Sequence, residues 1–357
     1  MTNGIDGAVN LGTPPLARQY ARFVLVRMVV LAGLALALVA AFLVDVATGP
    51  AALPIPDIIA GLIDRASLSR AQGVILWDVR LPYAAMAVFV GAALGLAGAE
   101  MQTVLNNPLA SPLTLGVSFA ATFGASVAIV LELDLFGFGR NYAIAGSAFA
   151  GAAASTMLIY GLSRMMGATR DTVVLFGIAI FFTFSALVSL IQFVASTDAL
   201  QQIVFWTMGS LARATWDKIA VIAVVVLLCV PLSLRHAWAL TALRGGEEHA
   251  RSFGIAVERL RLIVLLRASL LAAVAVAFAG AIGFIGLVGP HIARLLLGED
   301  HRFFLPGSAL AGAVVLSLAS IASKMIIPGL IVPIGIVTAL VGIPLFLGLV
   351  LTQGRGR

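Results

Sequence analysis

The sequence predicts an all-α integral membrane protein with about ten transmembrane helices in one bundle. The 357 residues are 61% hydrophobic and only 11% charged, and their mean hydropathy is +1.09, whereas roughly half of the residues in a soluble domain are apolar. The apolar runs are long enough for helices that need about 20 residues to cross a bilayer. Short alternating segments, which are typical of transmembrane strands, are missing. Helices must therefore satisfy the backbone hydrogen bonds in the lipid.

Ten apolar segments are the predicted transmembrane helices, and they form a single domain over residues 24–351 between tails at 1–23 and 352–357. The segments are Val24–Val46, Pro82–Leu105, Leu113–Leu131, Tyr142–Ser163, Thr172–Ala195, Lys218–Leu234, Leu260–Ala279, Ala281–Leu297, Leu305–Ser323 and Ile331–Leu351. The eighth, Ala281–Leu297, is short and is interrupted by glycine and proline, so we expect it to be buried or partly re-entrant. Asp198–Gly209 predicts a short extra helix outside the membrane.

The basic residues predict the orientation of the chain. Because the number of segments is even, both termini lie on one side, and the loops on that side hold most of the arginines. The positive-inside rule then places both termini in the cytoplasm, at the inner (cytoplasmic) membrane of the cell. The same bias accounts for the net charge of +6, so a nucleic-acid partner is not expected.

A charged island interrupts the apolar sequence at residues 240–261. Its charged residues are Arg244, Glu247, Glu248, Arg251, Glu258, Arg259 and Arg261. They must face water, and the predicted orientation puts them in the cytoplasm. The pair at 245–246 is Gly-Gly and can end one helix, the acidic pair at 247–248 suits the N-terminus of the next, and Gly254 can end that helix. We expect two short cytoplasmic helices around a glycine corner; the alternative is an ordinary solvated connector.

Two ionisable residues lie inside predicted transmembrane helices. Glu100 is a candidate for a functional intramembrane polar site, and the alternative is a carboxylate that faces a cavity or bonds to a neighbouring helix. Arg267 is about 9 Å deeper than Arg261 at the rise of an α-helix, and we expect its long side chain to extend back to the cytoplasm. The four histidines lack the spacing of metal ligands, so no metal site is predicted.

The chain has no sequence motif for binding ATP. Its two lysines are Lys218 and Lys324, and neither follows the glycine-rich loop that cradles phosphates in a Walker A site. The motifs of a membrane enzyme are missing as well. Any ATP-driven function therefore needs a partner chain that binds ATP and Mg²⁺, and no cofactor is expected on this one.

Several sequence strings follow one another in a characteristic order. They are Arg80–Pro82, Asn107–Gly116, Trp206–Leu211, Gly246–Gly254, Ala279–Arg294, Asp300–Arg302 and Pro333–Pro344. Together they resemble the permeases of the iron-siderophore and vitamin B12 ABC importer family (type II ABC importers), from residue 80 to residue 351. The most specific string is Gly-Phe-Ile-Gly-Leu-Val-Gly-Pro-His-Ile at 283–292. The permeases of this family have ten helices, in agreement with the independent count.

The resemblance implies roles for individual residues. The segment that docks on an ATPase subunit would contain Gly245, Glu247, Glu248, Ala250, Arg251 and Gly254, and the cytoplasmic gate would contain Thr169, Arg170, Asp171 and Thr172. Arg80 and Lys324 would meet acidic residues of a periplasmic or extracellular binding protein, with Tyr83 where the family often has a second arginine. The chain also departs from the family pattern at Ser320 and Leu330. A lysine at 324 keeps the charge but loses the bidentate fork of an arginine.

The resemblance also implies a function. The chain would be the permease subunit of a binding-protein-dependent ABC importer, and it would form the path for a ferric siderophore or a similar metal chelate, with haem and cobalamin as alternatives. Its partners would be two cytoplasmic ATPase subunits, the binding protein and a second permease, identical or different, in the lipid bilayer. The less favoured alternative is an ion-coupled secondary transporter, for which Glu100 and the glycine-rich eighth segment are the candidate sites.

Overall fold

A computed structural model describes residues 16–51, 53–134, 139–166 and 169–354, and these residues form helices and loops without strands. The α-helices are α1 (Leu16–Ala47), α2 (Ile55–Ile63), α3 (Arg70–Gly73), α4 (Leu81–Val104), α5 (Val117–Val130), α6 (Arg140–Met166), α7 (Arg170–Val194), α8 (Thr197–Thr207), α9 (Trp216–Arg235), α10 (Ala237–Arg244), α11 (Glu247–Ser252), α12 (Val257–Ala279), α13 (Ile285–Leu297), α14 (His301–Met325) and α15 (Ile334–Gly354). The 3₁₀ turns η1 (Arg65–Ser67) and η4 (Leu211–Arg213) and the π-helical η2 (Val74–Arg80) lie between them.

Ten apolar helices of the described residues correspond to the ten predicted segments. Seven helical runs are long and apolar enough to cross a membrane: Leu16–Ala47, Arg70–Val104, Arg140–Met166, Arg170–Val194, Trp216–Arg235, Val257–Ala279 and His301–Met325. The shorter apolar helices Val117–Val130, Ile285–Leu297 and Ile334–Pro344 account for the other three. The predicted all-α membrane fold in one bundle is therefore confirmed.

The first and last helices extend beyond the predicted boundaries of the domain. α1 begins at Leu16 rather than at Val24, because residues 16–23 are mostly good helix formers without glycine or proline. α15 continues to Gly354, past the predicted end at residue 351. The remaining tail residues, 1–15 and 355–357, lie outside the described residues.

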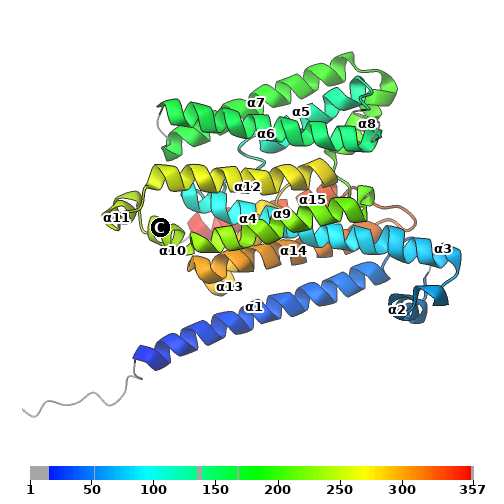
Figure 1. The fold of residues 1–357 in the computed structure, drawn as a ribbon, viewed down its shortest axis with the longest axis horizontal. Coiled ribbons are helices and arrows are strands. Elements are labelled where there is room, and N and C mark those ends of the chain that lie inside the picture. Colours follow the sequence, from blue (N-terminus) through cyan, green and yellow to red (C-terminus); the bar gives the residue numbers. More distant parts are fainter. Residues whose placement is uncertain (1–15, 52, 135–138, 167–168, 355–357) are drawn as a thin grey trace, which may run out of the picture.

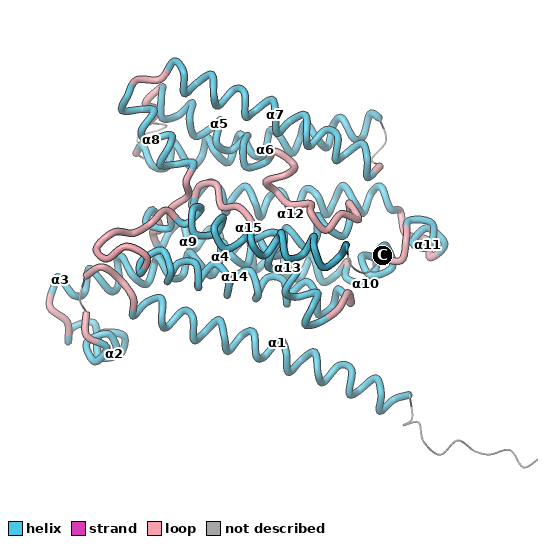
Figure 2. Tube along the Cα trace, turned by 180° about the vertical axis from the view of Figure 1, so that it is seen from behind, coloured by secondary structure: helices cyan, strands magenta, loops and turns pink. Residues whose placement is uncertain are grey.

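α4 lies at the centre of the bundle and contacts α14, α12, α13 and α9. α1 runs along the outside of the bundle against α14 (Figure 1). α5, α6, α7 and α8 form a group on the other side, which packs on α12 through α5 and α6, and the view from behind shows the same layers (Figure 2). The short α10 and α11 lie at one end of the bundle, and α2, α3 and α8 lie at the opposite end.

Glycines bring the central helices close together. A Cβ atom on Gly91 or Gly95 of α4 would lie under 3.0 Å from backbone atoms of α14, and one on Gly98 would lie equally close to the backbone of α13. Gly312 of α14 faces Gly91 in the same way. Small residues allow membrane helices to approach closely, so that van der Waals contacts between them hold the helices together. The glycines thus set the position of α4 against α13 and α14.

The glycine-rich eighth segment enters its helix through irregular backbone. Residues 280–283 are not helical, and both Gly280 and Phe284 have left-handed backbone angles, with φ of +78° and +67°. α13 then starts at Ile285, and most of its residues are buried. The prediction of a short, interrupted and buried segment is confirmed. The predicted extra helix at Asp198–Gly209 is also present, as α8.

Candidate functional site

The charged island folds into α10, a glycine corner and α11. Gly246 separates the two helices with φ of +118°, a conformation that a glycine adopts without strain. α11 ends in a Schellman motif, in which the N–H of Ile255 donates to the carbonyl of Ala250 at 3.2 Å and Gly254 has φ of +77°. The prediction of two short helices around a glycine corner is confirmed.

Arg261 connects the island to the central helices. Its side chain is only 1% exposed, although it lies in the first turns of α12. The Nε atom donates to the carbonyl of Val104 at the end of α4, at 3.0 Å, and the Nη2 atom forms an ion pair with Glu247 of α11. Glu247 also pairs with Arg251 at 3.3 Å. One buried side chain therefore contacts α11 and the end of α4 as well as its own helix, α12.

Arg244 fastens the end of α10 to the loop between α13 and α14. Its Nε and Nη2 atoms donate to the two carboxylate oxygens of Glu299 at 3.0 and 2.8 Å, and Nη1 donates to the side-chain oxygen of Asn106 at 2.9 Å. A bidentate pair of this kind fixes orientation. The hydrogen bonds from Arg244 hold the pKa of Glu299 below its usual value. The contribution of this carboxylate to stability is therefore complete above its usual pKa and is lost as the pH falls through the lower, folded-state pKa.

Arg244→Gln is expected to loosen α10 and α11 at pH 7 without unfolding the protein. The pair is partly exposed, so its loss costs up to about 1 kcal/mol. Hydrogen–deuterium exchange should become faster at residues 242–248 and stay unchanged in α4. Arg170→Gln is the control, because it removes an exposed ion pair with Asp171 outside the island. Equal exchange in the two variants would contradict the anchoring role of Arg244.

Exposed aromatic side chains lie beside the island. Trp238 of α10 is 62% exposed and Phe253, next to the end of α11, is 54% exposed. Their ring centroids are 5.8 Å apart, and the ring of His249 lies edge-on to Phe253 at 4.8 Å. Large aromatic side chains are common anchors in protein interfaces. The sequence alone does not single out Trp238, because its exposure depends on how α10 lies against the bundle.

The predicted gate residues form the start of α7. Thr169 is the N-cap, and its Oγ1 accepts a hydrogen bond from the N–H of Thr172 at 3.2 Å. Arg170 and Asp171 are exposed and pair with each other at 3.2 Å. The start of α7 lies at the same end of the molecule as α11 in both views (Figures 1 and 2). Among the hydrogen bonds and ion pairs of the described ranges, none joins these residues to the island, and their role as a gate stays a prediction.

The predicted docking residues Arg80, Tyr83 and Lys324 lie together at the opposite end of the bundle, with side chains that are buried. They are 5%, 4% and 7% exposed. Arg80 donates to three carbonyl groups at and after the end of α1, at 2.5–3.0 Å. The Tyr83 hydroxyl lies 3.3 Å from Ser323 Oγ, and Lys324 Nζ lies 4.6 Å from the centre of the Tyr83 ring. Acidic groups of a partner cannot reach these side chains in this conformation, so direct docking through them stays a prediction.

Ser320 and Lys324, two of the positions that depart from the family pattern, form one buried cluster with Asp45 of α1. Lys324 Nζ lies 2.7 Å from Asp45 Oδ1, and Ser320 Oγ donates to the same carboxylate at 2.7 Å. These residues therefore tie α14 to α1 instead of presenting a charge at the surface. Asp45 was missed from the sequence, because it lies at the end of an apolar segment, about 275 residues from its partners. Leu330, the remaining departure, is 62% exposed.

Glu100 and Arg267 form an ion pair inside the bundle. Glu100 is fully buried, and Arg267 Nε donates to its two carboxylate oxygens at 2.9 and 3.1 Å. Arg267 Nη1 donates to the carbonyl of Leu232 in α9 at 3.1 Å. The expectation that Arg267 extends to the cytoplasm is wrong, because its side chain is only 6% exposed and pairs with Glu100 inside the bundle. Glu100 is instead bonded to a neighbouring helix, which was the alternative for this residue.

Within the described part of the chain, no group of three or more His, Cys, Asp or Glu could hold a metal ion. The model of the FecCD transport family matches residues 22–352. The chain belongs to the FecCD transport family. The hemin transport system permease of Yersinia pestis is 37% identical, over 82% of this chain and 87% of its own length. The molybdate import system permease of Haemophilus influenzae is 34% identical, over 92% of this chain and 96% of its own.

A solved structure has the same fold as this FecCD chain. It is the inward-facing structure of a transporter assigned to the metal-chelate type of ABC transporter, and it is 32% identical in sequence. The match covers 90% of this chain and 99% of the other with a TM-score of 0.80. The FecCD chain is thus a multi-pass membrane permease of the ABC importers, which is a transport subunit.

Proposed function

We propose that residues 245–254 of this permease dock on a separate ATPase subunit and transmit its motion to the transport path. The contacts of Arg261 carry the proposal. Its buried guanidinium links Glu247 of α11 to the Val104 carbonyl at the end of α4 and to its own helix, α12. A rigid-body shift of α11 therefore moves the ends of two central helices, which is the kind of motion that switches transporters between states.

The proposed complex contains two permeases, two ATPase subunits and a binding protein. ATP and Mg²⁺ bind on the ATPase subunits, because this sequence has no Walker A loop. The island and both termini face the cytoplasm at the inner membrane, and the end with α2, α3 and α8 faces the binding protein. The excess of arginine in the loops at the island end supports this orientation.

The proposed cargo is a ferric siderophore or a similar metal chelate, with haem and cobalamin as alternatives. The structural neighbour of the metal-chelate type supports this class. The similar permeases for hemin and for molybdate carry different cargoes on one fold, so the fold alone does not select the ligand. Uptake of labelled ferric chelates, haem and cobalamin by the assembled complex in liposomes distinguishes the three.

An ion-coupled secondary transporter has less support. Such a protein needs an intramembrane carboxylate or an unwound helix where the coupling ion binds. Glu100 is fully buried and its carboxylate oxygens accept hydrogen bonds from Arg267, so its charge is already balanced inside the chain. Uptake driven by a proton or sodium gradient in liposomes without an ATPase would favour this alternative.

Removal of the exposed aromatic side chains tests the docking proposal. Trp238→Ala combined with Phe253→Ala is expected to weaken binding of the partner ATPase subunit by about 30-fold or more, as for the loss of an interface anchor. Binding is measured by surface plasmon resonance with the permease in nanodiscs. The matched control is Phe193→Ala, which removes an 87% exposed ring from α7, outside the island.

The outcomes of this experiment separate the docking site from a general effect of lost apolar surface. Unchanged ATPase binding in the double variant, with normal ATP-driven uptake, contradicts docking at the island. Equal weakening by Phe193→Ala contradicts it as well. Phe193 lies near the end of α7, which is at the opposite end of the molecule from the island (Figure 1).

A further inference from the structure

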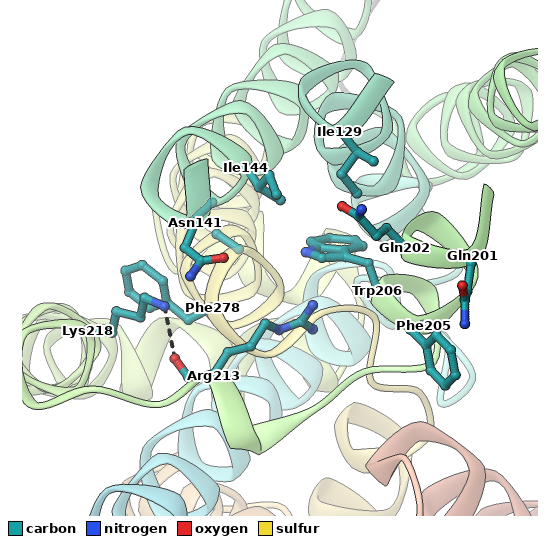
Figure 3. A pocket seen from close by; sticks show the side chains of 12 residues that line it. Ile129, Asn141, Ile144, Gln201, Gln202, Phe205, Trp206, Arg213, Lys218 and Phe278 are labelled. Atoms are coloured by element: carbon teal, nitrogen blue, oxygen red, sulfur yellow. Dashed lines mark hydrogen bonds between the residues drawn. The ribbon is translucent and has the colours of Figure 1, made fainter. Parts of the chain in front are cut away.

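A cavity lined by two cations lies at the end of the bundle opposite the island. It has a volume of about 380 Å³, and its walls come from the ends of α5 and α12, the starts of α6 and α9, the helix α8 and the turn η4. The lining side chains include Arg213 and Lys218 together with the amides of Asn141, Gln201 and Gln202. Asn141, Gln202, Trp206 and Arg213 point toward one shared space (Figure 3). This volume lies within the range of small-ligand sites.

Local backbone contacts hold the basic turn of the cavity in place. The N–H of Ser210 donates to the carbonyl of Ala279 at 2.7 Å, and Gly209 has φ of +71°. Ser210 Oγ then accepts from the N–H of Ala212 at 3.2 Å and caps η4. Arg213 consequently projects from a turn that is fixed against the end of α12.

The two cations of the cavity have no acidic partner in the described part of the chain. Lys218 is 6% exposed, and its Nζ donates to the backbone carbonyl of Arg213 at 2.9 Å. Arg213 Nη2 donates to the carbonyl of Ala279 at 3.3 Å, whereas its Nε is buried without a hydrogen-bond partner among the described residues. The adjacent Asp217 is exposed and forms no ion pair with either of them. Burial lowers the pKa of Arg213 to about 10, so it stays charged at neutral pH.

This arrangement differs from that of the other buried lysines and arginines among the described residues, of which three pair with acidic residues and the fourth, Arg80, donates to three backbone carbonyls. Lys324 pairs with Asp45, Arg267 with Glu100 and Arg261 with Glu247. A buried charge is costly unless an opposite charge or a set of hydrogen bonds compensates it. At the cavity the amide groups add donors but no negative charge. An anion from outside the chain would supply the negative charge that the lining of the cavity lacks.

We propose that this cavity binds an anionic carboxylate or phosphate group, held by Arg213 and Lys218. The guanidinium and the ammonium each provide a positive charge and N–H donors for the anion. The rings of Trp206, Phe205 and Phe278 line the same cavity and suit an apolar portion of the ligand. The group belongs either to a soluble polyanion or to the headgroup of an anionic phospholipid. The proposal does not depend on the transport function, because binding is measurable without ATP or uptake.

Binding of two probes to the purified full-length chain tests the proposal. In neutral detergent, equilibrium dialysis with radiolabelled citrate is expected to show saturable binding. In nanodiscs with phosphatidylglycerol, native mass spectrometry measures a retained lipid. Arg213→Gln and Lys218→Gln should each weaken binding by about tenfold or more, as for loss of a charged hydrogen bond. Arg213→Lys keeps the charge and should retain most of the binding.

Arg65→Gln is the matched control. Arg65 lies at the same end of the bundle, and its guanidinium is 5.8 Å from the ring centre of Trp77, compared with 5.6 Å between Arg213 and Trp206. Its side chain is 61% exposed, however, and it does not line the cavity. This variant should bind the probes like the unaltered protein.

The outcomes decide both the site and the source of the anion. Citrate binding that Arg213→Gln weakens assigns a soluble ligand, and phosphatidylglycerol retention that the same variant removes assigns a lipid headgroup. Binding of neither probe overturns the proposal, as does equal weakening by Arg65→Gln. Gel filtration and circular dichroism establish that each variant is folded, and Lys218→Gln carries the test if Arg213→Gln does not fold.

Discussion

Arg267→Met is expected to destabilise the protein by about 3–5 kcal/mol, because it leaves the carboxylate of Glu100 buried without its partner. Glu100 is fully buried, and its hydrogen bonds come mainly from this guanidinium. No water is available in the bilayer core to replace them. Unfolding by sodium dodecyl sulfate in mixed micelles, followed by circular dichroism, measures the loss of stability.

The double variant Glu100→Leu with Arg267→Met separates a missing partner from missing contacts. Replacing a whole buried pair with apolar residues is often neutral, so the double variant should recover most of the stability that Arg267→Met loses. Arg302→Gln is the control, because Arg302 forms an ion pair with Asp300 in which the arginine is 52% exposed. That variant should cost less than about 1 kcal/mol. A similar loss of stability in Arg267→Met and Arg302→Gln would show that breaking the buried pair costs no more than breaking an exposed one.

Gly95→Ala is the second large expected effect. Its Cβ atom would lie under 3.0 Å from the backbone of Ser308 in α14, so the two central helices must move apart. Overfilling of a well-packed interior costs about 1–3 kcal/mol, and here it also removes the close approach that stabilises membrane helices. The same unfolding assay measures the effect.

Gly161→Ala is the matched control for this substitution. Gly161 lies inside α6, and a Cβ atom there would meet nothing within 4 Å. Alanine has the higher helix propensity, so this variant should gain up to about 1 kcal/mol. Opposite signs for the two variants support close helix contact as the cause, whereas a gain of stability in both would refute it.

Much of the fold followed from patterns between residues that are near one another in the sequence. The apolar runs located all ten transmembrane helices, and the glycines and proline of the eighth segment predicted its interruption. The glycine pair at 245–246 and Gly254 predicted the corner and the end of α11, since both depend on local backbone conformation. The ends of α1 and α15 were less accurate, because helices continue into water when no residue stops them.

The candidate site was predicted less completely. The sequence located the island but not the buried contact of Arg261 with Val104, nor the exposure of Trp238. The resemblance assigned Arg80 and Lys324 to one docking face, but it did not show that their side chains are buried, and their role in docking stays a prediction. Those outcomes depend on which helices are neighbours, and a single sequence does not contain that information.

The sequence by itself thus determined the membrane class, the helices and the charged island, because apolar length, charge and local turn chemistry act over a few residues. Only the tertiary structure decided which charges are paired. Glu100 pairs with Arg267, which is 167 residues away in the sequence, and Asp45 accepts a hydrogen bond from Ser320, which is 275 residues away. Arg213 and Lys218, in contrast, have no acidic partner among the described residues. Electrostatic attraction falls off with distance in space, and that distance is set by helix contacts that glycines far apart in the chain make possible.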